Sequence, residues 1–238
     1  MPDVSYFPAE TRELKAYFAP PRGEGPFPGV VVVMDALGLS DDIKLAAERL
    51  AAAGYLAFAP DLYSGRGLKC VMATLQASRS GAGEAYEDIE AARQWLAERA
   101  DCTGRVGIIG FCMGGGFALL SAPRYDFAAS SVNYGEVPSD ASERLAGACP
   151  IVASYGRRDR GLKGRAERLE AALSALGVAH DVKEYPDSGH SFMNRINVGP
   201  ALGPAVKFLG FNYEHEDAED SWRRILDFFD AHIASPTS

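Results

Sequence analysis

The most constraining feature of this sequence is the alternation of short apolar segments with helical ones. Alternation with short connections favours an α/β protein with a mostly parallel central sheet and helices on both faces. Apolar runs predict strands at Gly29–Met34, Tyr55–Phe58, Val106–Ile109, Ala128–Val132, Ile151–Ser154 and His180–Tyr185. Helical spacing and end signals predict helices at about Ser40–Ala53, Glu84–Arg99, from Cys112 onward, Lys163–Leu176 and Ala218–Ile233.

The remaining segments carry weaker signals. Arg12–Phe18 is predicted as an edge strand, Leu62–Gly83 as irregular, and Ser188–Glu216 as a long loop. Ser40 is expected to cap the helix that it begins. Because crossovers between parallel strands are right-handed, all strand-to-helix loops are expected at one edge of the sheet, where ligands bind in such folds.

Composition limits what the chain is expected to bind. The 238 residues are 47% hydrophobic and 24% charged, which is typical of a globular protein, and we predict a single domain over residues 1–238. The formal net charge is −8 and no basic run carries interleaved aromatic residues, so nucleic acid is not an expected partner. The longest apolar run, Val30–Met34, is too short for a membrane span, and the N-terminus lacks a signal-peptide pattern. We therefore expect a cytoplasmic protein with no membrane partner.

One of the four cysteines, Cys112, lies in a turn that suits a nucleophile. The four form no C-x-x-C pair, so no metal is expected, and Cys102 and Cys149 are interpreted as small buried side chains. Cys112 is the centre of Gly110-Phe-Cys-Met-Gly114, between a buried strand and a helix. This is the nucleophile-elbow pattern with cysteine in place of serine. The helix N-terminus favours a thiolate there, and the N–H of Met113 is free to stabilise an oxyanion.

A thiol nucleophile needs a base, and the base needs an orienting acid. Asp159 and His190 each follow a predicted strand, in the order nucleophile, acid, histidine that this arrangement requires. Taken alone, Asp159 lies in an Arg-Arg-Asp-Arg run where a solvated ion pair is the simpler interpretation. Asp187 is a competing carboxylate, but it lies on the histidine's own loop. Together, Cys112, His190 and Asp159 predict a catalytic triad.

Five segments give the chain a resemblance to a known family. They are Val31-Val-Val-Met-Asp-Ala-Leu-Gly38, Gly54-Tyr-Leu-Ala-Phe-Ala-Pro-Asp-Leu-Tyr63, Gly110-Phe-Cys-Met-Gly-Gly115, the Gly156-x-x-Asp159 turn and Ser188-Gly-His-Ser-Phe192. In this order they resemble the dienelactone hydrolase (carboxymethylenebutenolidase-like) family of the α/β-hydrolases. The resemblance implies an α/β-hydrolase fold without a large cap domain. It also implies hydrolysis of a small ester or lactone by a Cys–His–Asp triad through a thioester, without metal or organic cofactor.

The resemblance also assigns residues around the thiol. The family has an acidic residue after the second strand, usually glutamate, which is thought to help deprotonate the cysteine. Asp35 holds this position with a side chain one methylene shorter. An ordinary residue of a strand-end turn is the alternative interpretation of Asp35. The N–H groups of Ala36 and Met113 are implied as the two oxyanion donors.

The substrate contacts resemble those of the family less closely. Family members bind a substrate carboxylate with arginines, but Asn194 stands where one of them is expected and Arg195 is the next residue. Asn133-Tyr134-Gly135 replaces the family's Tyr-Tyr-Gly. Each predicted cationic contact has a solvated surface charge as its alternative. The predicted substrate contacts are Asn133, Tyr134, Phe192, Arg195 and Arg79, with Arg66 and Lys69 as alternatives to Arg79.

Two other functions remain open. An amidotransferase or glyoxalase-like enzyme also uses a cysteine elbow, commonly without the widely separated acid and histidine; a distance well beyond roughly 5 Å between His190 and Cys112 would favour it. A non-catalytic small-molecule-binding protein on a hydrolase scaffold is the third hypothesis. The expected partner is a small ester or lactone that can carry a carboxylate, and the expected assembly is a monomer or a small homo-oligomer.

Overall fold

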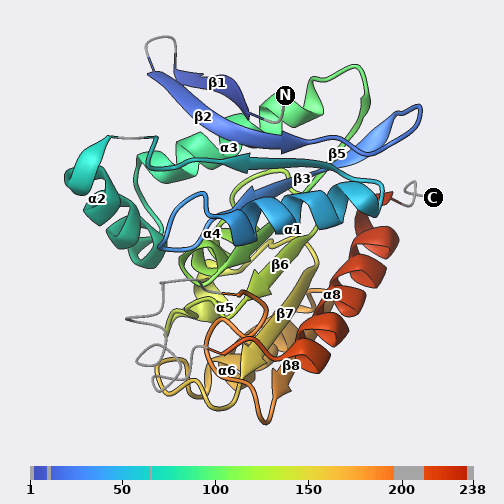
Figure 1. Ribbon diagram of the computed structural model, residues 1–238. Helices are drawn as coiled ribbons and strands as arrows, with labels where there is room; N and C mark the ends of the chain where they lie inside the picture. Colours follow the sequence, from blue (N-terminus) through green and yellow to red (C-terminus); the bar gives the residue numbers. More distant parts are fainter. Residues whose placement is uncertain (1–2, 10–11, 65, 196–211, 235–238) are drawn as a thin grey trace.

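The computed structural model describes residues 3–9, 12–64, 66–195 and 212–234. In this part of the chain, eight strands form one sheet in the order β1-β2-β4-β3-β5-β6-β7-β8 (Figure 1). From β4 to β8 neighbouring strands are parallel, whereas β2 runs antiparallel to both β1 and β4. The predicted α/β class and mostly parallel sheet are confirmed. The strands are β1 (Asp3–Ala9), β2 (Arg12–Ala19), β3 (Phe27–Val33), β4 (Leu56–Pro60), β5 (Cys102–Phe111), β6 (Ser130–Asn133), β7 (Ile151–Gly156) and β8 (His180–Tyr185).

Helices cover both faces of the sheet. The chain moves along the sheet in one direction from β3 to β4 and in the other from β4 to β5, and right-handed crossovers in opposite directions lie on opposite faces. Helices α1 and α8 share one face, where an ion pair joins Arg49 of α1 to Glu219 of α8 at 2.6 Å. The crossovers place α3, α4 and α6 on the other face. The helices are α1 (Asp41–Ala52), α2 (Gly67–Ser80), α3 (Glu84–Ala97), α4 (Met113–Ser121), α5 (Ala141–Arg144), α6 (Arg165–Leu176) and α8 (His215–Phe229), followed by the π-helical turn η1 (Asp230–Ala234).

The central strands form the core. Residues Val30, Val31, Val32 and Val33 of β3 are completely buried. A parallel strand covered by helices on both faces has no solvent side, so it is apolar throughout rather than alternating. This is why the apolar runs of the sequence predicted the central strands well, and why the loops that follow them have fixed positions at the carboxyl edge of the sheet.

The prediction that Arg12–Phe18 is an edge strand is wrong in its position. The segment forms β2, but β1 pairs with it on its outer side, with Asp3 opposite Tyr17 and Tyr6 opposite Leu14. This edge of the sheet is therefore β1, a seven-residue strand that was not predicted and whose sequence is interrupted by Pro8.

The prediction that Leu62–Gly83 is irregular is also wrong, because α2 spans most of it. This helix has no side-chain cap, no acidic residue in its first turn and only Thr74, Ala77 and Ser78 buried. Small buried residues give little apolar periodicity, so the usual helix signals are missing.

Other boundaries differ slightly. The last helix begins at His215 rather than Ala218, and the predicted loop Ser188–Glu216 lies in part outside the described residues, at 196–211. Ser40 precedes α1 but makes no side-chain capping hydrogen bond. Among the helices of the described residues, none combines the length and apolar character needed to cross a bilayer.

Candidate active site

Cys112 lies in a strained turn between β5 and α4. Its backbone has φ 54° and ψ −114°, a conformation that side-chain-bearing residues rarely adopt. The turn needs glycine at Gly114, because a Cβ there would lie 2.6 Å from the carbonyl oxygen of Met34. The close packing of α4 against the end of β3 therefore depends on this glycine. This packing places Cys112 at the N-terminus of α4.

The structure brings together the three residues predicted as a triad. The Cys112 Sγ lies 3.0 Å from His190 Nε2, and His190 Nδ1 lies 2.5 Å from Asp159 Oδ2. These residues follow β5, β8 and β7, so all three stand at the carboxyl edge of the sheet. An acid held on one imidazole nitrogen and a thiol on the other is the arrangement that activates a nucleophile.

Asp159 is a buried residue of the site rather than a solvated ion-pair partner. It is 8% exposed, and its Oδ1 accepts hydrogen bonds from the N–H groups of Gly161 at 2.9 Å and Leu162 at 3.3 Å. The competing carboxylate, Asp187, instead pairs with Arg158 on the surface at 2.5 Å. Two backbone donors and one imidazole thus fix Asp159 in place.

The contacts of His190 favour its charged form. Burial lowers the pKa of His190, but hydrogen bonds to Asp159 and Cys112, together with their charges, outweigh burial and raise that pKa to about 10. An imidazolium is therefore expected at neutral pH, facing the thiol on one side and the carboxylate on the other.

Two backbone N–H groups, those of Met113 and Ala36, were predicted as oxyanion donors. Met113 is the first residue of α4, so its N–H has no partner within the helix. In the turn after β3, the N–H of Leu37 bonds to Asp35 Oδ1 and the N–H of Gly38 to the carbonyl of Asp35. No hydrogen bond from the N–H of Ala36 occurs in the described part of the chain. Both predicted oxyanion donors are thus placed in turns next to the elbow.

Sequence reasoning missed Tyr63, which joins these two turns. Its hydroxyl donates to the carbonyl of Ala36 at 3.1 Å and lies 3.9 Å from the Met113 sulfur. Burial, followed by the charge of Asp35, raises the pKa of Tyr63 to about 12, so it stays a donor at neutral pH. The signal that was available is its position after β4, in a loop at the same edge of the sheet.

Asp35 is a buried carboxylate on the other side of the site. It is 5% exposed, and its Oδ2 accepts a hydrogen bond from Asn194 Nδ2 at 3.4 Å. Burial raises its pKa, and the hydrogen bonds from Leu37 and Asn194 oppose the rise. In the described structure no hydrogen bond joins Asp35 to Cys112, so any effect of this carboxylate on the thiol acts through space.

Three predicted substrate contacts are buried. Asn133 donates to the carbonyl of Gly110 at 3.2 Å and to Ser131 Oγ at 3.1 Å, behind the elbow. Tyr134, 1% exposed, packs edge-on against His190 at 5.4 Å between ring centroids, and also against Phe192 at 5.7 Å. These residues support the histidine and the elbow from behind.

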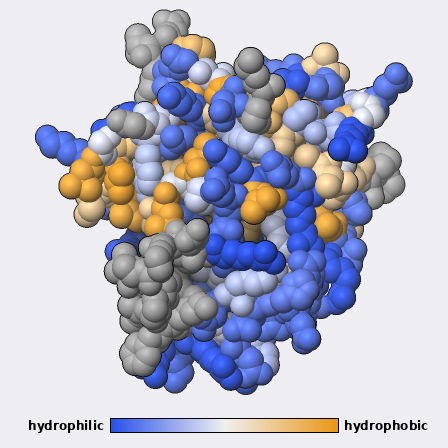
Figure 2. Space-filling model, in the orientation of Figure 1, coloured by the Kyte–Doolittle hydropathy of each residue, from blue (hydrophilic) through white to orange (hydrophobic). Residues whose placement is uncertain are grey.

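The predicted cationic contacts point elsewhere. Arg195 places its guanidinium 4.6 Å from the ring centre of Tyr213, and Arg66 pairs with the buried Asp88 at 3.3 Å. Arg79 and Lys69 are exposed on the outer side of α2 and border a groove of about 920 Å³ with Leu68 and Met72. Figure 2 shows the apolar surface of α2 at the left of the molecule.

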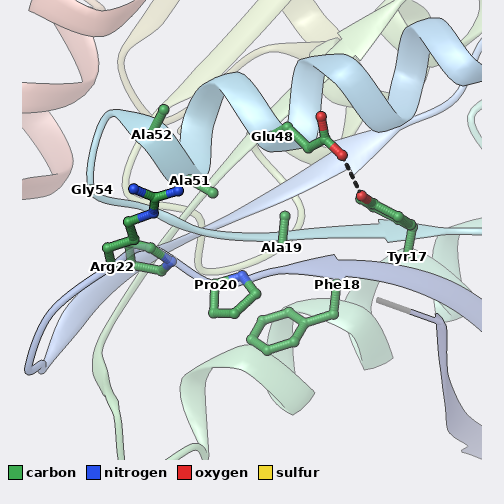
Figure 3. A pocket seen from close by; sticks show the side chains of 10 residues that line it. Tyr17, Phe18, Ala19, Pro20, Arg22, Glu48, Ala51, Ala52 and Gly54 are labelled. Carbon is green, nitrogen blue, oxygen red and sulfur yellow. Dashed lines mark hydrogen bonds between the residues drawn. The ribbon is translucent and has the colours of Figure 1, made fainter. Parts of the chain in front are cut away.

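A separate hollow of about 770 Å³ lies at the opposite, amino edge of the sheet (Figure 3). The end of β2 and the last turn of α1 line it, and the Tyr17 hydroxyl donates to Glu48 Oε1 at 2.6 Å across it. This hydrogen bond raises the pKa of Tyr17 to about 12. The hollow contains none of the predicted site residues, and no group of three potential metal ligands occurs among the described residues.

Comparison with known proteins identifies the family of the chain. The sequence model of the dienelactone hydrolase family matches residues 14–233. A protein of Methylorubrum extorquens named "Putative carboxymethylenebutenolidase" is 30% identical, over 93% of this chain and 78% of that protein. A protein of the same name from Escherichia coli K12 is 29% identical, over 93% of this chain and 84% of that protein.

Solved structures share the fold. A dienelactone hydrolase-like promiscuous phosphotriesterase from metagenomic libraries superposes with a TM-score of 0.79 at 23% identity, covering 97% of each chain. Dienelactone hydrolase from Anabaena variabilis gives a TM-score of 0.71 at 19% identity, again over 97% of each chain. The expected fold and the expected ester- or lactone-cleaving class are thus confirmed, and the chain belongs to the dienelactone hydrolase family of hydrolases.

Proposed function

We propose that the chain hydrolyses a small ester or lactone through Cys112, His190 and Asp159, by way of a thioester. The observation that carries the proposal is the continuous contact from Asp159 Oδ2 to His190 at 2.5 Å and from His190 to Cys112 Sγ at 3.0 Å. The raised pKa of His190 supports a charged imidazolium that faces the Cys112 side chain before substrate arrives.

The first half of the reaction forms the thioester. The Cys112 thiolate attacks the ester carbonyl carbon, and the carbonyl oxygen gains the negative charge, which the N–H groups of Met113 and Ala36 stabilise. The C–O bond to the alcohol then breaks, and the leaving oxygen takes the proton from His190. In a lactone the alcohol remains part of the same molecule.

The second half regenerates the enzyme. The now neutral His190 removes a proton from water, whose oxygen attacks the thioester carbonyl carbon. The C–S bond breaks, the thiolate of Cys112 returns to face the imidazolium, and the carboxylic acid product loses its proton to solvent. Asp159 keeps the imidazole oriented in both halves, and Asp35 is proposed to help deprotonate the thiol.

The same distances argue against the two alternative functions, an amidotransferase or glyoxalase-like enzyme and a non-catalytic binding protein. The 3.0 Å contact between His190 and Cys112 lies within the limit that separates this reaction from the amidotransferase or glyoxalase-like reading. A purely binding protein would have no need of Asp159, held by two backbone donors behind the imidazole.

Turnover of p-nitrophenyl acetate tests the proposal. Wild type is expected to show acyl-enzyme formation, seen as an acetyl mass increase on the peptide that contains Cys112, and Cys112→Ala is expected to lose nearly all hydrolysis. Cys149→Ala is the matched control, since burial raises the pKa of that thiol to about 12 and keeps it unreactive. Full activity in Cys112→Ala, or an acetyl group on another residue, would contradict the proposal.

A further inference from the structure

Asn194 lies on the loop that carries His190 and uses both ends of its side chain inside the protein. Its Oδ1 accepts a hydrogen bond from the Tyr134 hydroxyl at 3.1 Å, and its Nδ2 donates to Asp35 Oδ2 at 3.4 Å. Its backbone N–H donates to the carbonyl of Ser191 at 2.9 Å, and the residue is 6% exposed. A buried amide that is bonded on its backbone and at both ends of its side chain has a fixed position.

The two partners of the amide decide which end faces Asp35. An ionised carboxylate only accepts hydrogen bonds, so it favours the NH2 end of Asn194, whereas the oxygen end would place lone pairs against lone pairs. The Tyr134 hydroxyl donates to the oxygen end and so keeps the NH2 end turned toward Asp35. Burial raises the pKa of Tyr134 well above its usual value, and this hydroxyl therefore keeps its proton at neutral pH. Tyr134 thus selects, through Asn194, the amide orientation that suits an ionised Asp35.

Asp35 is a buried carboxylate whose ionised form needs such donors. Burial raises its pKa, and the hydrogen bonds from the N–H of Leu37 at 2.8 Å and from Asn194 oppose the rise. Two charged groups of other elements act on it in opposite directions: Asp42 of α1 raises the pKa of Asp35, and the charge of His190 lowers it. Loss of the Asn194 donor would therefore shift this balance toward the protonated acid.

Two tyrosines also face Asp35 from other loops. The charge of Asp35 adds to burial in raising the pKa of Tyr63 to about 12, and it contributes in the same direction to the pKa of Tyr134. Both hydroxyls hold their protons at neutral pH, so neither adds a charge next to the carboxylate. The Tyr134 hydroxyl differs from that of Tyr63 because it reaches Asp35 through a bonded amide.

We infer that Tyr134 and Asn194 are positioning residues that together hold the Asp35 carboxylate ionised, and therefore able to help deprotonate Cys112. The inference rests on the proposed hydrolysis and on the part that Asp35 has in it. A protonated Asp35 cannot accept a proton. Loss of either positioning residue should therefore shift the acidic limb of the pH profile, and not merely lower the rate at every pH.

The pH dependence of kcat/KM for p-nitrophenyl acetate tests the inference, because kcat/KM reports the ionisation of groups in the free enzyme. Wild type is expected to lose activity on the acidic side as Asp35 is protonated, and Asp35→Asn is expected to lack that limb. Asn194→Leu removes the donor and should move the limb upward by about one pH unit. Asn194→Asp keeps the size of the side chain but adds a like charge, so it should move the limb further in the same direction.

Tyr134→Phe removes a single hydroxyl and is the variant that disturbs folding least. It leaves the Asn194 amide free to turn, so the acidic limb should move upward by about half a pH unit. Tyr155→Phe is the matched control. It removes the hydroxyl of another buried tyrosine, one that has no hydrogen-bond partner among the described residues, and it should keep the wild-type profile.

A lower rate with an unshifted limb in Asn194→Asp and Tyr134→Phe would mean that these residues serve only packing, and it would overturn the inference. An acidic limb that persists unchanged in Asp35→Asn would also overturn it, because Asp35 would then not be the group that titrates. The proposed hydrolysis fails on a different readout, which is the absence of an acetyl group on Cys112 of the wild type.

Discussion

The two carboxylates at the reactive edge of the sheet are held in opposite ways. Asp159 lies against an imidazole whose pKa is raised to about 10, so its charge is paired. Asp35 lies against a backbone N–H and the amide of Asn194, both neutral. Both carboxylates are buried, so the difference comes from their partners and not from their exposure. One carboxylate is placed to orient the imidazole, and the other has only neutral hydrogen-bond donors among the described residues.

Removal of the Asp159 carboxylate should have the largest effect on activity. In Asp159→Asn the imidazole loses the acceptor that orients it, and kcat for p-nitrophenyl acetate is expected to fall on the order of 10³-fold. Asp187→Asn, at the exposed carboxylate that pairs with Arg158, is the control and should stay within about twofold of wild type. Similar losses of kcat in both variants would contradict a specific role for Asp159 in orienting the imidazole.

Removal of the Asp35 carboxylate, whose hydrogen-bond donors are neutral, should reduce activity less. Asp35→Asn is expected to lower kcat/KM for a small ester by about 10- to 100-fold, because the carboxylate that is proposed to help deprotonate the thiol is lost while His190 remains. The rate of alkylation of Cys112 by iodoacetamide should fall in parallel. A loss of turnover with unchanged alkylation would place Asp35 with the substrate rather than with the thiol.

Removal of the Tyr63 hydroxyl, which joins the turns of Ala36 and Met113, should have a smaller effect on activity. Tyr63→Phe removes the hydroxyl that donates to the carbonyl of Ala36, a contact worth about 0.5–1.5 kcal/mol, so a two- to tenfold fall in kcat with little change in KM is expected. Tyr213→Phe removes a hydroxyl that bonds only to His215 among the described side chains, and it serves as control. An effect on KM alone would argue against a role in oxyanion placement.

The pH dependence of stability tests the charge of His190 without any measurement of activity. The folded-state pKa of His190 is raised above its unfolded value, so between pH 6.5 and about 10 the folded state holds a proton that the unfolded state has released. The contribution of His190 is complete below pH 6.5 and is lost as the pH rises through about 10. We expect Tm to fall across this window more steeply for wild type than for His190→Gln; parallel curves would contradict the charged pair.

Much of the fold was predictable because buried parallel strands are apolar throughout. Val30–Val33 and Ile151–Val152 could hardly be anything else in a chain of this composition. The segments that were misjudged, β1 and α2, have weak patterns of their own and form because other elements cover them. Tyr6 of β1, for example, is 2% exposed and packs edge-on against Phe58 of β4 at 5.3 Å.

The elbow around Cys112 and the order of Asp159 and His190 are properties of the sequence itself. A glycine-flanked turn between a strand and a helix is a local constraint, and the parallel sheet then carries the loops after β7 and β8 to the same edge. The link from Tyr134 through Asn194 to Asp35 is decided by the tertiary structure alone. It joins residues 60 and 159 positions apart, and hydrogen bonds across three loops depend on side-chain directions that no local spacing encodes. The sequence therefore determined the kind of chemistry, and packing decided which partners hold each side chain of the site.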